Sequence, residues 1–241
     1  GSRSPMTMTP EEILATFPPG SKLRPLVERL LDPDERKRDE ARLALAPFGK
    51  TALDEREAHA LLVVATEMTF PPERLEWRNS RTDVLAVVWS SPHPSLAAGA
   101  VRAYPAGDDD LRAALLALLA AIGTRDSVRA LADCIAAHGW PARPYPRVFS
   151  ELSRLTDFAD FLFPALLERA GPLLVDVGNV ALAALASGKL SPAALGPLAP
   201  SLRDRLAKSL DALEKALQPT GIGWRFEETY APSRSEAGFL L

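Results

Sequence analysis

Residues 26–49, LVERLLDPDERKRDEARLALAPFG, contain the pattern that decides the fold. An apolar helical run ends at the corner 32–34, because proline stops one helix and suits the first turn of the next. A second helix follows, and we expect it to bury a stripe that includes Ala41 and Leu45. Gly49 is expected to close this helix in the left-handed conformation. The stretch therefore predicts two antiparallel helices joined by a tight corner.

The composition favours helix throughout the chain. Of the 241 residues, 47% are hydrophobic, which is enough for a sizeable core. Alanine and leucine dominate, whereas β-branched and aromatic residues are sparse. The 22 prolines and 14 glycines fall between apolar helical runs and mark their ends. We therefore expect roughly a dozen helices and no strand.

Charge and cysteine content narrow the class of protein. The net charge of −3 argues against a dedicated binder of duplex DNA, which usually has a strong basic excess. The single cysteine, Cys134, excludes an intrachain disulfide and suits a reducing compartment, so we expect a cytoplasmic protein. The sequence has no apolar run long enough to predict a membrane-spanning helix.

The chain divides into three predicted segments. Residues 1–8 are expected to be an expression remnant and a disordered N-terminus. Residues 9–217 are expected to form one helical repeat domain, which begins with a capping box at Thr9 and Glu12. Residues 218–241 are expected to be an extended tail and the start of a further helix.

The pattern of the opening pair recurs along the chain. When residues 88–107 are aligned without gaps with residues 30–49, the corner at 90–94 matches the corner at 32–34. Gly99 then matches Ala41, another small residue. Small residues thus recur where paired helices come close. The next pair, 108–138, begins with aspartates, whose charge suits the positive end of a helix dipole. An extra helix at 51–68 separates the first two pairs.

Several details of the helices are predicted as well. Thr51 is expected to cap the helix that ends near Met68. Pro164 should kink or break the helix at 157–170. The helix at 173–187 is apolar nearly all round, so we expect it to be covered on both sides. The residues expected in the core between stacked helices are Leu45, Leu115, Leu119, Ile122 and Leu131.

These helix pairs resemble HEAT repeats. The resemblance rests on the corner, the basic-then-apolar helix and the closing glycine of 22–49, extends over 80–138, and is looser over 147–217. It implies an all-α fold, namely an α-solenoid in which antiparallel helix pairs stack into a superhelix of the armadillo type. In this arrangement residues 80–89 pair with the segment that follows the corner at 90–94 and ends at Gly107. A generic helical bundle is the alternative.

Motifs that carry catalysis are absent from the sequence. It contains no nucleotide-binding loop, no metalloprotease motif and no hydrolase elbow. Cys134 and His138 share a helix face, but two ligands do not make a zinc site, and we interpret them as a core cysteine and a helix-end histidine. We therefore expect no catalytic residue, no cofactor and no bound metal.

Two aromatic stretches are the candidate contact surfaces. The rigid, proline-rich connector at 139–146 displays its side chains at little entropic cost. The second stretch combines aromatic and arginine side chains at 224–230. In both, the alternative is that the rings pack over the ends of neighbouring helices. The candidate binding residues are Trp140, Arg143, Tyr145, Arg147, Trp224, Arg225 and Tyr230.

These observations predict a non-catalytic protein–protein interaction scaffold, with another protein as its partner. The runner-up is a HEAT-like nucleic-acid-binding protein or DNA glycosylase, because HEAT-like folds include glycosylases that grip duplexes on a concave basic face. The third reading is a small-molecule enzyme on an unrelated helical fold. A capping box at Ser233 and Glu236, followed by apolar residues to Leu241, further predicts that the chain is a piece of a longer protein.

Overall fold

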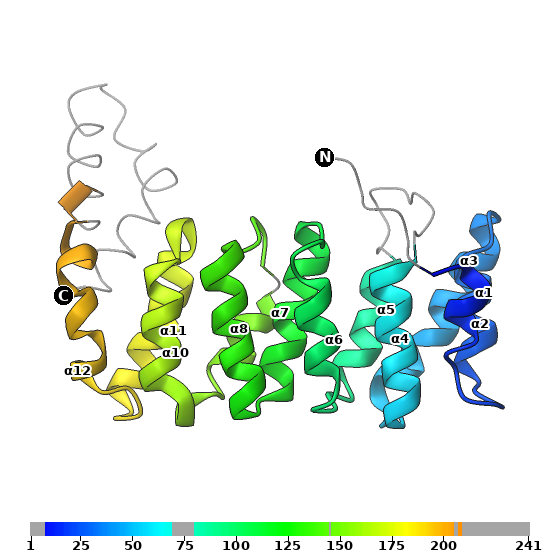
Figure 1. Ribbon diagram of the computed structural model, residues 1–241, viewed down its shortest axis with the longest axis horizontal. Helices are drawn as coiled ribbons and strands as arrows, with labels where there is room; N and C mark the ends of the chain where they lie inside the picture. Colours follow the sequence, from blue (N-terminus) through cyan, green and yellow to red (C-terminus); the bar gives the residue numbers. More distant parts are fainter. Residues whose placement is uncertain (1–7, 69–79, 145, 205–206, 209–241) are drawn as a thin grey trace, which may run out of the picture. The chain divides into compact units, whose positions relative to one another are not determined.

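The computed structural model describes residues 8–68, 80–144, 146–204 and 207–208. Every regular element in these ranges is a helix, which confirms the all-α prediction (Figure 1). The chain forms two compact units. Unit 1 comprises residues 1–134 and 141–148, and unit 2 comprises residues 135–140 and 149–241. The predicted segment 218–241 and all but the last residue of the predicted segment 1–8 lie outside the described residues.

Four helices of unit 1 begin at a threonine or aspartate whose side chain caps the first turn. The elements of unit 1 are α1 (Pro10–Leu14), α2 (Leu23–Leu30), α3 (Glu35–Leu45), the 3-10 helix η1 (Ala46–Lys50), α4 (Glu55–Glu67), α5 (Ser80–Trp89), α6 (Leu96–Ala103), α7 (Asp109–Ile122) and the greater part of α8 (Arg125–His138). The capping box at α1 is confirmed: the Glu12 N–H donates to Thr9 Oγ1 at 3.2 Å, and the Thr9 N–H donates to Glu12 Oε2 at 2.7 Å.

The helices of unit 1 pack in two layers (Figure 1). Helix α2 lies against α3, α4 against α5, and α6 against α7. Neighbouring pairs meet within each layer, because α4 contacts α1 and α6 while α5 contacts α3 and α7. The packing therefore groups α5 with α4, rather than with the 96–107 segment as the sequence comparison suggested. The reason is the long apolar face of α4, which buries Ala58, Leu61, Leu62 and Val64.

Gly99 has the close-packing role that the sequence comparison predicted for a small residue. A Cβ atom at this position would lie 3.0 Å from Cδ2 of Leu62, on the neighbouring helix α4. A larger side chain on α6 would therefore force Leu62 to move.

The core of unit 1 is centred on α7. Of the core residues expected from sequence, Leu45, Leu115, Leu119 and Leu131 are fully buried. Ile122 is only half-buried, because it lies at the end of α7 beside the left-handed Gly123. Within α7, every residue from 113 to 120 is at most 1% exposed. The apolar run at 113–120 therefore reflects contact on every side of this part of α7.

Two predicted helix ends are wrong. Gly49 does not have a positive φ; it lies within η1, where the chain tightens into a 3-10 turn instead of a left-handed cap. Thr51 ends η1 and does not cap α4. The α4 cap is Asp54, whose carboxylate accepts from the N–H groups of Arg56 and Glu57. Aspartate offers a charged acceptor at the helix start, and one turn of chain separates it from Thr51.

Unit 2 has shorter helices interrupted by 3-10 turns. Its elements are η2 (Thr156–Phe158), α10 (Ala159–Glu168), η3 (Gly171–Leu173), α11 (Leu174–Ala186), α12 (Pro192–Leu195) and η4 (Gly196–Leu198), and it shares α9 (Pro146–Leu152) with unit 1. Helix α10 packs against α11 and α12. It runs through Pro164 without a break, since the helix is held by buried neighbours on both sides of the proline, including Phe163 and Leu166.

Helix α11 is not covered on both sides as its sequence suggested. It buries one face, formed by Leu174, Val177, Gly178, Ala181 and Ala184. Val180 and Leu182 are half-buried, and Asn179 is exposed. A helix that is apolar all round can thus still pack mainly on one face.

Candidate functional site

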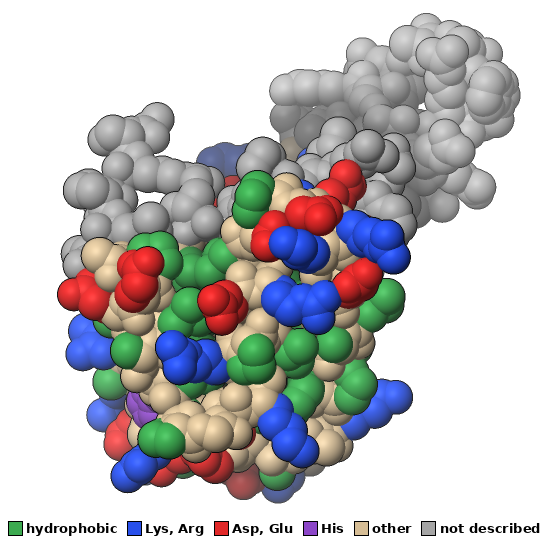
Figure 2. All heavy atoms as spheres, turned by 90° about the vertical axis from the view of Figure 1, so that its right-hand side faces the viewer, with side chains coloured by type: hydrophobic (Ala, Val, Ile, Leu, Met, Phe, Trp, Pro, Cys, Tyr) green, Lys and Arg blue, Asp and Glu red, His purple; other side chains and the backbone are tan. Residues whose placement is uncertain are grey.

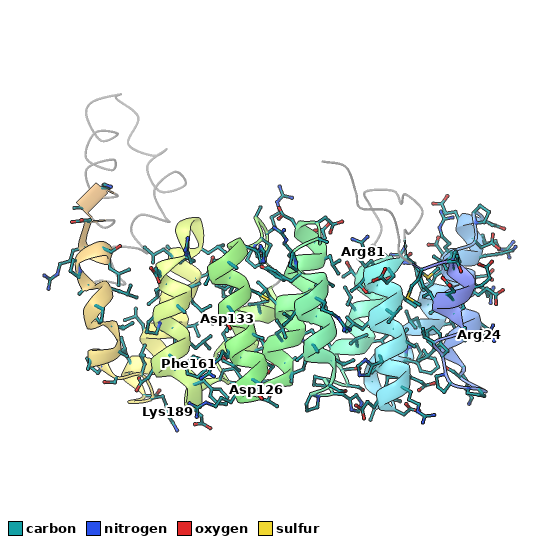
Figure 3. All side chains as sticks on the ribbon, viewed as in Figure 1. Arg24, Arg81, Asp126, Asp133, Phe161 and Lys189 are labelled. Carbon is teal, nitrogen blue, oxygen red and sulfur yellow. The ribbon has the colours of Figure 1, made fainter. Side chains whose placement is uncertain are left out.

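Several arginine side chains of unit 1 hold its helices together. The Arg42 Nε of α3 lies 2.8 Å from Asp83 Oδ2 of α5, and these side chains are 10% and 16% exposed. The Arg81 Nη1 of α5 lies 2.8 Å from Oδ2 of Asp108, whose other oxygen caps α7 through the Leu111 N–H (Figure 3). Partly buried pairs with hydrogen-bonding geometry position helices more firmly than exposed ones.

The corner at 32–34 is stabilised by a second set of polar contacts. Buried Arg38 donates through Nη1 to the backbone carbonyls of Asp32, at 2.9 Å, and Pro33, at 2.8 Å. Asp32 also accepts from the Asp34 N–H and pairs with Lys37 Nζ at 2.9 Å. These contacts lower the pKa of Asp32, with the backbone hydrogen bond as the largest cause. The basic residues of α3 thus serve its own corner and neighbouring helices.

The predicted connector residues have different surroundings. Trp140, in unit 2, is half-buried and stacks on Phe149, with ring centroids 6.1 Å apart and planes inclined by 19°. Its buried Nε1 makes no hydrogen bond with any residue that the structure describes. Arg143, in unit 1, is exposed. The remaining predicted binding residues apart from Arg147 lie outside the described residues: Tyr145, Trp224, Arg225 and Tyr230.

Arg147 contacts Trp89, which also lies in unit 1. Its guanidinium carbon lies 5.7 Å from the centroid of the Trp89 ring, a cation–π arrangement. Its Nη2 donates to the Trp89 carbonyl at 3.4 Å, where a positive charge suits the C-terminal end of α5. The Trp89 Nε1 donates to the Ala114 carbonyl of α7 at 3.0 Å. Arg147 therefore anchors the connector to α5, a role that the sequence pattern did not reveal.

The histidines and the cysteine have structural surroundings. His59 Nε2 lies 3.0 Å from Ser95 Oγ, and His93 Nε2 lies 3.0 Å from the Leu53 carbonyl. Burial, with a smaller contribution from Asp133, raises the pKa of Cys134 to about 11, so its thiol is protonated at neutral pH. Among the described residues, no group of histidine, cysteine, aspartate and glutamate side chains could hold a metal ion.

A cleft of about 600 Å³ lies between the end of α1 and α2, within the size range of ligand sites. We term it the α1–α2 cleft and define it by Leu14, Phe17, Pro18, Arg24, Pro25 and Glu28. Figure 2 views unit 1 from the side of helices α1, α2 and α3, between the first two of which the cleft lies. On this face, hydrophobic side chains lie among basic and acidic ones. The residues PPG at 18–20 predict only the end of a helix, and no pattern in the sequence indicates this cleft.

The wall of the cleft is held in place by hydrogen bonds. The Ser21 N–H donates to the Pro18 carbonyl at 3.1 Å, which closes the turn after α1. The Ser21 Oγ accepts from the Leu23 N–H at 3.2 Å and donates to Glu57 Oε1 of α4 at 2.7 Å. The loop between α1 and α2 is thereby tied to a third helix, so the cleft is preformed.

The two charged side chains of the cleft are available to a ligand. Arg24 and Glu28 are exposed and lie one helical turn apart on α2. Neither side chain forms an ion pair or hydrogen bond with any part of the chain that the structure describes. Figure 3 shows Arg24 at the outer edge of unit 1, away from α4. The cleft thus combines the apolar side chains of Leu14, Phe17, Pro18 and Pro25 with one charged side chain of each sign that has no partner among the described residues.

Comparisons with protein families, with characterised proteins and with solved structures give no significant match. The described helices also include none that is long and apolar enough to cross a membrane.

Proposed function

We propose that this chain is a HEAT-like α-solenoid of stacked antiparallel helix pairs and that it works as a non-catalytic scaffold for binding another protein. The packing of unit 1 carries the proposal. Each pair, α2 with α3, α4 with α5, and α6 with α7, contacts the next pair along the chain, and the pairs build two layers. Neighbour-only stacking is the rule that generates solenoids, and solenoids present extended surfaces to partners.

The placement of polar groups agrees with this reading. In unit 1, the arginines of α3 and α5 are engaged with carboxylates or backbone carbonyls, and Cys134 is buried with a raised pKa. An enzyme site instead gathers perturbed titratable groups in a cleft. The α1–α2 cleft has charges and apolar walls but no histidine, cysteine or paired carboxylates, which suits binding better than catalysis.

A free thiol in the core also suits the reducing environment of the cytoplasm, where we place the protein. The nucleic-acid-binding alternative rests on the concave basic face of HEAT-like glycosylases. The basic side chains at the corner and on α3 lie beside Asp32, Glu40 and Asp83, so they do not form a continuous basic face.

The proposal is tested by affinity capture with the immobilised protein in extracts treated with nuclease. We expect a defined protein to be retained, and retention to fall for Arg143→Ala if the connector contributes a contact. Arg102→Ala is the matched control, because Arg102 is equally exposed on α6 in the same unit. Both variants should keep the melting temperature of the parent chain.

The alternative is tested in parallel with a labelled DNA duplex. Tight binding that falls steeply between about 50 and 200 mM salt would favour a nucleic-acid binder and contradict the scaffold.

A further inference from the structure

We propose that the α1–α2 cleft docks an extended peptide segment of a partner protein, with an acidic and a basic residue two positions apart and an apolar residue two positions further along, on the same face of the peptide. The inference rests on the proposed scaffold function and assigns it a site. It follows from the free charges, the apolar walls and the rigidity of the cleft.

The spacing of the charges matches an extended chain. Arg24 and Glu28 are four residues apart on α2, and with a rise of 1.5 Å per residue they are separated by roughly 6 Å along the helix axis. In an extended peptide, side chains two positions apart lie on the same face, at roughly 6.6 Å. One acidic and one basic side chain of such a peptide therefore reach both partners at once.

The walls of the cleft suit the apolar part of the peptide. Leu14, Pro18 and Pro25 line it, above the buried ring of Phe17, which is 6% exposed. Proline walls lose little entropy on binding, and the hydrogen bonds of Ser21 already hold them in place.

The charges of Arg24 and Glu28 favour a peptide over a nucleic acid or an acidic membrane as the occupant of the cleft. A phosphate backbone would meet Arg24 but would be repelled by Glu28 one turn away. An acidic membrane surface meets the same obstacle. A peptide with both signs of charge complements both side chains, and exposed pairs of this kind contribute mainly to specificity.

The experiment uses the full chain and a fluorescein-labelled peptide with Asp-Leu-Lys at its centre and a further leucine two positions after the lysine, on the same face as the two charges. Binding is followed by fluorescence anisotropy. One control peptide has Asn-Leu-Gln at the centre, and another has the two charged residues adjacent, where they point to opposite faces. We expect the first peptide to bind about three- to tenfold more tightly than either control. Equal binding of all three peptides, or no binding at all, would overturn the proposal.

Two variants test the assigned side chains. Arg24→Glu should weaken the Asp-Leu-Lys peptide by about three- to tenfold, because both cleft charges become negative. The double variant Arg24→Glu/Glu28→Arg restores one charge of each sign, and an extended peptide can lie in either direction, so binding should recover. Arg102→Glu changes the net charge equally at a distant exposed site and should have no effect. Equal losses for Arg24→Glu and Arg102→Glu would show that only net charge matters and would overturn the site.

Failure of this site is separable from failure of the scaffold function. If the parent chain and Arg24→Glu capture the same protein equally well, the peptide-docking proposal is wrong and the scaffold function still holds. Self-association of the parent chain that Arg24→Glu abolishes, seen by analytical ultracentrifugation, would identify a second copy as the occupant and overturn the peptide proposal. Retention of nucleic acid in place of protein would overturn both.

Discussion

Three long helices of unit 1 and two long helices of unit 2 begin in different ways. In unit 1, α3, α4 and α7 start at Asp34, Asp54 and Asp108, and each carboxylate accepts from a backbone N–H in the first turn. In unit 2, α10 and α11 follow the 3-10 turns η2 and η3, and their first residues have no side-chain cap. A charged acceptor lets a helix start abruptly, whereas an uncapped start is drawn out over a tighter turn.

The units also differ in how they bury apolar helices. Residues 113–120 of α7 in unit 1 are buried on every side, whereas α11 in unit 2 buries one face and leaves Val180 and Leu182 half-buried. Residues 113–120 of α7 are all apolar, and α11 is apolar apart from Asp176 and Asn179. The apolar content of a helix therefore limits how much of its surface can be buried. The number of neighbouring helices decides how much of that surface is buried.

The largest expected effect lies in the core of unit 1. Leu119→Ala should lower the free energy of unfolding by about 2–5 kcal/mol, because Leu119 is fully buried within α7. Leu182→Ala on α11 is the comparison, and its half-buried site should cost less. Urea denaturation followed by circular dichroism measures both. A cost below about 0.5 kcal/mol for Leu119→Ala would mean that α7 is not the centre of unit 1.

The connector offers the next contrast. Trp140→Ala removes the stacking on Phe149 within unit 2 and should cost about 1–3 kcal/mol, whereas exposed Arg143→Ala should leave stability within about 0.5 kcal/mol of the parent. Thermal melts of both variants decide the outcome. An unchanged melting temperature for Trp140→Ala would restore this ring as a candidate contact surface for the partner.

The helix starts can be tested directly. Asp54→Ala should cost about 0.5–2 kcal/mol, since it leaves the N–H groups of Arg56 and Glu57 without their acceptor. Ser191→Ala removes the cap of the four-residue helix α12 in unit 2 and should cost less. Asp54→Asn keeps an oxygen acceptor and should recover most of the loss. If Ser191→Ala were the more costly change, the contrast between the units would be wrong.

Two glycines of unit 1 test how closely its helices approach. Gly49→Ala should raise the unfolding free energy by about 0.4–1 kcal/mol, because its φ is not positive and a Cβ there meets no atom within 4 Å. Gly99→Ala has a similar gain in helix propensity but sets the new Cβ 3.0 Å from Leu62. We expect the gain in helix propensity and the cost of the close contact with Leu62 to offset each other in the free energy of unfolding. A Gly99→Ala variant as stable as Gly49→Ala would show that α4 and α6 have room to spare.

The smallest effect is the pH dependence of the corner. The pKa of Asp32 is lowered by the Asp34 N–H and by Lys37, so its stabilisation is present above its ordinary pKa of 3.8 and is lost as the pH falls through the lowered value. Asp32→Asn should therefore flatten the acid limb of stability against pH below about pH 4. The comparison is Asp157→Asn in unit 2, where the Lys189 Nζ lies 3.7 Å from the carboxylate. An equal flattening in both variants would contradict a special role for the corner.

The site illustrates where prediction from sequence stopped. The connector was singled out because its aromatic and arginine residues match contact surfaces, yet Arg147 stacks on Trp89 in the same unit. The partner ring lies 58 residues earlier in the chain, and no local pattern links the two. The α1–α2 cleft escapes prediction for a related reason: the loop that borders it is tied to α4 by the contact between Ser21 and Glu57, which are 36 residues apart.

The sequence by itself determined the helical class, the corner at 32–34 and the capping box at Thr9, because these features depend on side chains within about one helical turn. Only the tertiary structure decided which helices pair, where Gly99 meets Leu62, and which apolar helix is buried on every side. Those outcomes depend on contacts between residues far apart in the chain. Which outcome is stable depends on the difference in free energy between whole arrangements of helices. A local pattern of residues does not contain that difference.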